Sequence, residues 1–205
     1  PRAKAVALAI NSPGGSPVQS ALIAGRIREL AAEKELPVMA FVEDVAASGG
    51  YWLATAADEI YADSASVIGS IGVISAGFGF QDAIAKLGIE RRVYTAGENK
   101  GMLDPFKAAD PKDEERLNVI LNDLHQLFRT HVETRRAGKL VAGDEELFSG
   151  AFWTADAARE RGARGCRPPR QASAPCEHAS SPRLATPTPQ RILALLFFHA
   201  RDRTA

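Results

Sequence analysis

The sequence predicts an α/β fold with a largely parallel sheet flanked by helices. Short apolar runs of strand length, stretches with helical periodicity between them, and glycine-containing turns at their junctions all point to this class. The chain has 205 residues, of which 45% are hydrophobic. It is therefore long enough and apolar enough to form one domain with a buried core.

The predicted strands and helices alternate along the chain. A buried strand at 5–10 (AVALAI) is followed by the turn NSPGGS and an amphipathic helix at 18–34. A second buried strand at 36–42 leads to a Ser-Gly-Gly turn and a helix over 51–60. Further short strands are expected at 59–62, 66–74 and 91–95, and a further helix at 80–87.

The second half of the chain begins with a long predicted helix at 112–137, which carries an apolar stripe. His125 and His131 lie on this helix, and we interpret them as surface or partly buried helix residues. Residues 147–162 predict a strand, a turn and a helix. The segment 163–205 holds half of the chain's 12 prolines and seven arginines but no lysine, and we expect it to be a disordered tail.

Composition argues against several classes of function. Lys plus Arg and Asp plus Glu number 25 each, so the overall charge gives no reason to expect nucleic acid as a partner. No apolar stretch approaches the roughly 20 residues of a membrane-spanning helix. Cys166 and Cys176 lie outside the well-patterned region and offer no disulfide or metal framework, so no metal is expected.

Ser48 is the residue that most constrains function. It lies in the run VEDVAASGGYWLATAADEI, in a sharp turn between a predicted strand and a predicted helix. Gly49 and Gly50 allow the tight turn and leave room for a substrate carbonyl. A serine there could be a nucleophile, but the same tetrapeptide fits an ordinary helix N-cap, so Ser48 needs support from other parts of the chain.

A serine nucleophile needs a base. His125 and His131 fall on a helix rather than on a loop after a strand, which argues against a Ser-His-Asp triad. A lysine can act instead where burial lowers the pKa of its ammonium group from about 10.4. The candidate is Lys100, in the loop TAGENKGMLDPF directly after the strand expected at 91–95; the alternative is a solvated loop lysine.

Four motifs taken together resemble the bacterial signal peptide peptidase A family, including its SohB-like members. The resemblance implies a Clp-protease/crotonase-like fold, with a peptidase domain at 1–162. It also implies a serine endopeptidase that needs no cofactor and cleaves hydrophobic or unstructured peptides such as remnant signal peptides. The motifs are NSPGGS at 11–16, VAASGGYWLATAAD at 45–58, IGSIGVI at 68–74 and TAGENKGMLDPF at 95–106.

The resemblance also implies roles for individual residues. Ser48 corresponds to the nucleophile and Lys100 to the base of a Ser-Lys dyad, and their spacing agrees with that of the family. Ser70 is expected to hydrogen-bond the lysine and orient its amine; otherwise it is a turn serine between two glycines. Oxyanion-hole amides are expected from Gly14 or Gly15, and from Gly49.

Assembly and location follow from the same resemblance. Relatives form rings or dome-like assemblies, so a homo-oligomer is expected, with the dyad either inside one subunit or shared by two. The chain begins Pro1-Arg2 and has neither an initiator methionine nor a signal peptide, which predicts a fragment that lacks its first strands. We expect a bacterial protein, either cytoplasmic or membrane-associated through a missing N-terminal segment.

Three alternatives stay open at this point. The proteolytic subunit of Clp protease shares the SPGG turn, but this chain has Val73 where that family has its catalytic histidine. A crotonase-type acyl-CoA enzyme shares the fold and the oxyanion hole but typically lacks a nucleophilic serine joined to a lysine. An inactive scaffold of the same fold is the third, because after Gly162 the chain lacks the family's Leu-Val-Asp-like continuation.

Overall fold

The computed structural model describes residues 3–163 and 195–197. These residues form two compact units. The first contains residues 3–72, 127–163 and 195–197, and the second contains residues 73–126. The helix α4 (Pro111–Arg135) contributes to both units.

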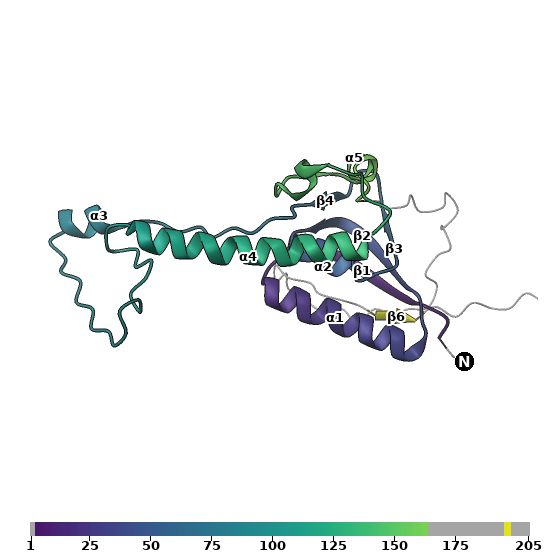
Figure 1. Cartoon of the computed structure of the whole chain (residues 1–205), viewed down its shortest axis with the longest axis horizontal. Helices are drawn as coiled ribbons and strands as arrows, with labels where there is room; N and C mark the ends of the chain where they lie inside the picture. The colour runs from purple at the N-terminus through teal and green to yellow at the C-terminus, as the bar shows by residue number, and fades with distance from the viewer. Residues whose placement is uncertain (1–2, 164–194, 198–205) are drawn as a thin grey trace, which may run out of the picture. The chain divides into compact units, whose positions relative to one another are not determined.

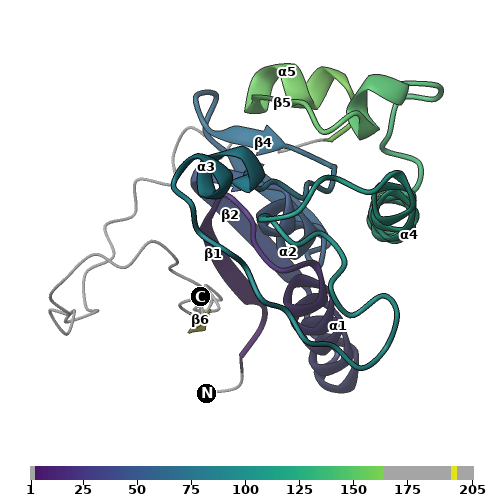
Figure 2. The same ribbon diagram turned by 90° about the vertical axis from the view of Figure 1, so that its left-hand side faces the viewer.

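The first unit is built on a largely parallel sheet in which β2 lies between β1 and β4 (Figure 2). β2 pairs in parallel with β1, β3 and β4, whereas β5 runs antiparallel to β4 and β6 antiparallel to β1. The predicted α/β class is confirmed. The strands are β1 (Val6–Ser12), β2 (Val38–Ala47), β3 (Glu59–Ala62), β4 (Val67–Gly69), β5 (Phe152–Thr154) and β6 (Leu195–Phe197).

The strand β6 lies within the segment 163–205 for which the sequence predicts disorder. Residues 195–197 pair with the β1 residues 6–8, so this short part of the segment is ordered as a strand. The remainder of the predicted tail, from residue 164 to 194 and from 198 onward, lies outside the described residues, as do both cysteines.

Helix α1 (Pro17–Lys34) begins and ends where its sequence signals lie (Figure 1). Ser16 is its N-cap and accepts a hydrogen bond from the Gln19 N–H at 3.5 Å, and proline occupies the first turn, where no donor is lost. The helix ends at Glu35, which adopts a left-handed conformation with φ 51°. Its buried residues are the small Ser20, Ala24 and Ala31, which allow α1 to pack closely.

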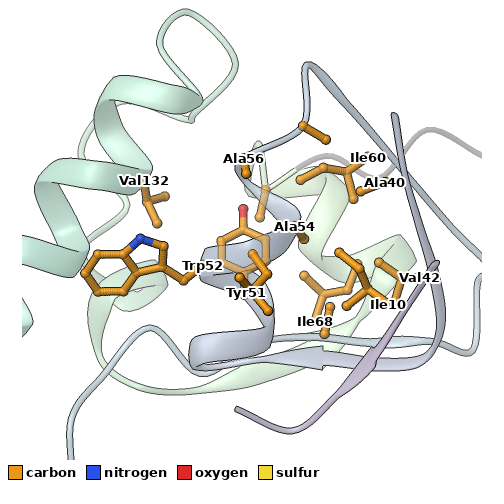
Figure 3. Packing of buried hydrophobic residues seen from close by; sticks show 14 of the residues in the cluster. Ile10, Ala40, Val42, Tyr51, Trp52, Ala54, Ala56, Ile60, Ile68 and Val132 are labelled. Atoms are coloured by element: carbon orange, nitrogen blue, oxygen red, sulfur yellow. The ribbon is translucent and has the colours of Figure 1, made fainter. Parts of the chain in front are cut away.

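Helix α2 (Gly49–Ala54) is the centre of the core, because all six of its residues are buried. It packs against β1, β2 and α1. The Trp52 ring stacks on Phe128 at 4.6 Å and on His131 at 5.1 Å, both from α4. Figure 3 shows Trp52 on the side of α2 nearest Val132, while Tyr51 points among the apolar residues of the sheet.

The predicted boundaries needed correction in three places. β2 does not end at residue 42 but continues to Ala47, because Glu43 and Asp44 lie exposed while Ala46 and Ala47 return to the core. As a result, Ser48 follows the strand directly. The helix expected over 51–60 is the shorter α2, and the strand expected at 66–74 is confined to β4.

The segment 147–162 contains the predicted strand and helix, but the turn precedes the strand, and the helix follows the strand directly. A short 3-10 helix, η1 (Glu145–Phe148), precedes β5, and α5 (Ala155–Glu160) follows it. The N–H of Ala155 donates to the carbonyl of Ser66 at 2.8 Å, which fastens the start of α5 to the end of the loop before β4.

The second unit contains α3 (Gln81–Lys86), loops and the first part of α4. The prediction of a strand at 91–95 is wrong. These residues form no strand and pair with no strand in the described chain. Arg91 instead binds Asp104 at 2.9 Å and lies 4.8 Å from the centre of the Phe106 ring. No residue of 73–126 is buried.

Candidate active site

Three parallel strands end at the same edge of the sheet, and each is followed by a predicted site motif (Figure 2). Ser12 at the end of β1 is in register with Ala46 of β2, and Ala47 is in register with Gly69 of β4. The NSPGG turn, Ser48 and Ser70 therefore leave the sheet side by side. Ligands of open α/β sheets commonly bind outside the carboxyl ends of the strands.

Ser48 has a backbone conformation that is unusual for a residue with a side chain, with φ 52° and ψ −125°. Its N–H donates to the Gly69 carbonyl at 2.8 Å, and its carbonyl accepts from the Trp52 N–H at 3.0 Å. The half-buried side chain makes no capping hydrogen bond to α2 and none elsewhere in the described chain. Ser48 therefore occupies the N-cap position of α2 without capping the helix through its side chain, and its hydroxyl is available for another role.

Gly14 lies directly against Ser48. Its φ is +116°, a conformation that favours glycine, and an added Cβ would lie 2.7 Å from the Ser48 Cβ and 3.0 Å from the Gly49 nitrogen. On the other side of the contact, a Cβ on Gly49 would collide with the Ser20 hydroxyl and lie 3.2 Å from the Gly15 nitrogen. The NSPGG turn and the Ser48 turn thus pack backbone against backbone, and side chains would separate them.

The backbone donors of these two turns differ in what they bind. The Gly14 N–H donates to the Ser12 hydroxyl at 3.3 Å. The N–H groups of Gly15 and Gly49 have no acceptor among the residues that the structure describes. Two fixed donors are therefore free beside Ser48, and a third is occupied by Ser12. Ser12 was not among the predicted site residues, although its place at the start of the SPGG turn was a signal.

A cavity of about 250 Å³ opens beside the free amides of Gly15 and Gly49. Ser48 does not line it, but Gly14, which contacts Ser48, does. The walls come from the NSPGG turn and from the facing sides of α1 and α2. The lining residues are Ser12, Gly14, Gly15, Ser16, Gln19, Ser20, Ile23, Gly49 and Leu53.

Ser70 follows the neighbouring strand β4 and, like Ser48, has a positive φ. Its φ is 55°, its N–H donates to the Ala151 carbonyl at 2.6 Å, and it is half-buried. It follows Gly69, whose carbonyl accepts the Ser48 N–H. An added Cβ on Gly69 would lie 3.0 Å from the Trp153 ring, so this turn also depends on glycine.

Lys100 lies in the second unit, in an exposed turn in which its N–H donates to the Gly97 carbonyl at 3.2 Å. The other predicted site residues all lie in the first unit. The pairing of Lys100 with Ser48 therefore stays a prediction. The residues of the first unit are Gly14, Gly15, Ser48, Gly49 and Ser70.

His131 belongs to the core, in agreement with the prediction of a partly buried helix histidine. Its Nε2 lies 3.0 Å from the Thr55 hydroxyl, and its ring stacks on Trp52. Burial lowers the pKa of His131 to about 4. The imidazole is therefore neutral near pH 7 and serves packing.

Metal-binding clusters and membrane-spanning helices also bear on function. Within 3–163 and 195–197, no group of three or more His, Cys, Asp or Glu side chains is arranged to hold a metal ion. Over the same residues, every helix is too short or too polar to span a bilayer.

Comparison with known proteins identifies the family. The model of peptidase family S49 matches residues 31–163. The chain is 36% identical over 163 residues to the chloroplast serine protease SPPA of Arabidopsis thaliana, and 31% identical over 157 residues to protease 4 of Haemophilus influenzae. These matches cover 78% and 72% of this chain, but only 23% and 25% of the relatives.

A third relative carries a different name. Over 161 residues, the chain is 58% identical to a Brucella melitensis protein named Na(+)/H(+) antiporter NhaA; the match covers 78% of this chain and 22% of that protein. The antiporter name describes a protein of which the matched part is a small fraction, whereas the family model describes the matched region itself. The chain thus spans a quarter or less of each of these three relatives, and it belongs to peptidase family S49, whose Clp-protease/crotonase-like fold agrees with the α/β structure.

Proposed function

We propose that this chain is a serine endopeptidase in which Ser48 is the nucleophile and Lys100 the general base. The observation that carries the proposal is the Ser48 turn: a strained serine with a free hydroxyl, packed against two backbone amides that have no acceptor in the described chain. Strained backbone at a strand end is a common feature of catalytic nucleophiles. Membership of peptidase family S49 supports the same activity.

The reaction would proceed through an acyl-enzyme. The neutral amine of Lys100 accepts the proton of Ser48 as its Oγ attacks the peptide carbonyl. When the tetrahedral intermediate collapses, the C–N bond breaks and the Lys100 ammonium protonates the leaving amine. Lys100 then takes a proton from a water molecule, whose oxygen attacks the ester carbonyl. As the bond between the carbonyl carbon and Ser48 Oγ breaks, the Lys100 ammonium returns the proton to Oγ and the acid is released. These steps require no metal or cofactor.

The oxyanion would be bound by Gly15 and Gly49 rather than by Gly14. The Gly14 N–H already donates to Ser12, while the other two N–H groups are free of acceptors in the described chain. Backbone donors are effective in this role because they are fixed before negative charge develops, and losing one such donor typically costs about 3 kcal/mol of transition-state stabilisation. Ser70, which leaves the sheet beside Ser48, would orient the Lys100 amine.

The substrates would be hydrophobic or unstructured peptides such as remnant signal peptides. An extended peptide is needed because the scissile carbonyl has to reach Ser48 at the edge of the sheet. Ser48 is only half-buried, which leaves this approach open. A folded substrate could not place its backbone against the Gly15 and Gly49 amides without local unfolding.

The protein would act as a homo-oligomer. None of residues 73–126 is buried in the single chain, and Ile74, Phe78 and Tyr94 are 84%, 80% and 91% exposed. A unit in which no apolar residue is buried gains little to offset its loss of conformational entropy. Contact with a second copy would supply that burial for the unit that carries Lys100.

Labelling with a fluorophosphonate, combined with hydrolysis of an unstructured peptide, tests the active site. Ser48→Ala is expected to abolish both signals, and Lys100→Ala to reduce hydrolysis by about 10³-fold or more, because a dyad acts as a unit. Ser70→Ala should lower activity less and change the pH–rate profile. Matched controls are Ser64→Ala and Lys86→Ala, two exposed residues that should keep full activity.

Undiminished labelling of Ser48→Ala would refute the proposed nucleophile, and absence of labelling in the wild type would favour the inactive scaffold. Mixing the Ser48→Ala and Lys100→Ala proteins tests the assembly. Recovered hydrolysis means that two subunits share the dyad, whereas no recovery from a mixed oligomer means that the dyad lies in one chain. A monomer in light scattering would contradict the oligomer.

A further inference from the structure

The strands β1 and β2 do not keep one register along their length, and the register changes just before the proposed active site. Ile10 lies opposite Val42. Two residues later on β1, Ser12 lies opposite Ala46, which is four residues after Val42 on β2. The strand β2 therefore carries two extra residues within 43–45. Extra residues of this kind bend a strand locally, and they are frequent next to active sites.

This register shift brings the NSPGG turn and Ser48 together. With one continuous register, Ser12 would lie opposite Asp44. Two residues of a parallel strand span roughly 6–7 Å, so the turn after Ser12 would then fall short of Ser48 by about that distance. The observed contact leaves no such margin, because a Cβ on Gly14 would lie 2.7 Å from the Ser48 Cβ. The proposed oxyanion site therefore depends on the shift.

Side chains bind β2 on both sides of the shift. On the side of β1, the Asn11 Nδ2 donates to the Asp44 Oδ2 at 2.8 Å. On the side of β4, the buried Ser66 hydroxyl donates to the Glu43 carbonyl at 2.6 Å. Asn11 is the β1 residue that lies between the two registers. The hydrogen bond from Asn11 to Asp44 thus joins the two strands at the point where their register changes.

We propose that Asn11 and Asp44 are positioning residues for peptide hydrolysis, and that their hydrogen bond holds the register shift that keeps the NSPGG turn against Ser48. The inference rests on the proposed peptidase function. In this role neither side chain touches the substrate, and each acts through the backbone that follows it. Asp44 is exposed and Asn11 half-buried, so both can be substituted without opening the core.

The chemistry of the pair allows the hydrogen bond to be removed and then restored. Asn11→Asp places two carboxylates against each other, and like charges repel at this separation. Asp44→Asn leaves two amides, one of which can still donate to the other. The exchanged pair combines Asn11→Asp with Asp44→Asn. It restores the hydrogen bond, with the amide donor now on β2 and the carboxylate acceptor on β1.

The experiment measures kcat and KM for an unstructured peptide, and the rate of fluorophosphonate labelling, on the full 205-residue chain. Asn11→Asp should lower kcat and the labelling rate about ten-fold or more with little change in KM, because a misplacement of about 1 Å at a reacting centre can cost about 100-fold. Asp44→Asn and the exchanged pair should both stay within about three-fold of the wild type, since each keeps a hydrogen bond.

Arg26→Glu is the matched control. It also places a second carboxylate beside an existing one, because Arg26 and Glu29 form an exposed ion pair at 3.0 Å on α1. It should keep the wild-type kcat. Urea denaturation of each variant separates the proposed role from a purely structural one, which would lower the free energy of unfolding and leave kcat of the folded protein unchanged.

A wild-type kcat in Asn11→Asp, or a loss of kcat that the exchanged pair does not restore, would overturn the positioning role and leave the peptidase standing. If Asn11→Asp does not fold, Asn11→Ala takes its place, because it removes the hydrogen bond without adding a charge. A loss of about three-fold or more in kcat would then support the role, and a wild-type kcat would contradict it. If the wild type cleaves no peptide in a Ser48-dependent manner, the peptidase itself fails, and this role with it.

Discussion

His131 makes the stability of the core dependent on pH. The histidine lies between Trp52 and Thr55, and burial lowers its pKa from 6.5 to about 4. In the unfolded chain its pKa returns to about 6.5. Between these two values the unfolded state binds more protons than the folded state, so the free energy of unfolding falls as the pH is lowered.

The expected size of the effect follows from the shift. For a fully buried group, the change from 6.5 to about 4 would lower the free energy of unfolding by about 2 kcal/mol between pH 7 and pH 5. His131 is only half-buried, and solvent screens the charge of its protonated form. We therefore expect a loss of about 1 kcal/mol. Carboxylates contribute little in this window, because they titrate near pH 4 in the unfolded chain.

Urea denaturation at several pH values between 5 and 7, followed by tryptophan fluorescence, measures this loss directly, because Trp52 lies against His131. His131→Gln should have a nearly flat dependence on pH, whatever its stability at pH 7. Ser64→Ala, a substitution at an exposed residue, should keep the wild-type slope. The same slope in wild type and His131→Gln would refute the argument.

Three more substitutions test the packing in the same assay. The Tyr51 hydroxyl is buried without a hydrogen-bond partner in the described chain, so Tyr51→Phe should raise the free energy of unfolding by up to about 1 kcal/mol; a clear decrease would mean that the hydroxyl is bound. Gly25→Ala should also stabilise, by about 0.5–1 kcal/mol, because Gly25 lies within α1 with open space around its Cα. Gly50→Ala should destabilise by about 1–3 kcal/mol, because its Cβ would collide with the Ser12 backbone; equal effects of the two glycine substitutions would contradict this.

Much of the fold follows from local sequence. The strands at 5–10 and 36–42 are predictable because they are continuous apolar runs of strand length, and β1 and β2 lie there. Helix α1 is predictable from its cap and periodicity. The end of β2 could not be predicted, since Glu43 and Asp44 are both exposed and break the apolar run, although the strand continues past them with a shift of register against β1.

The strand predicted at 91–95 shows a limit of local pattern. A strand needs a partner that supplies hydrogen bonds, and none of the strands in the described residues pairs with this segment. Residue composition within a segment carries no information on whether such a partner is present. Arg91 binds Asp104 instead, an ion pair across a loop that periodicity does not report.

The candidate site was predictable as a set of motifs but not as a geometry. Gly14, Gly15, Ser48 and Gly49 could be selected because their motifs occur together, in the same order and at similar spacing, in the family that the chain resembles. The choice between Gly14 and Gly15 as donor could not be made, because it depends on a hydrogen bond from the Gly14 N–H to Ser12. The cavity could not be predicted from the sequence either, because it forms only where α1 and α2 pack together.

The position of Ser48 depends on a part of the chain that contributes no predicted catalytic residue. The Ser48 N–H is held by Gly69, and the N–H of the next residue, Ser70, is held by Ala151. The backbone at Ser48 is thus supported through two successive hydrogen bonds by a segment that follows α4. A shorter protein that stopped at the end of α4 would keep every residue of the proposed mechanism and lose the outer of these two supports. The smallest chain that keeps both supports of Ser48 therefore extends at least to Ala151.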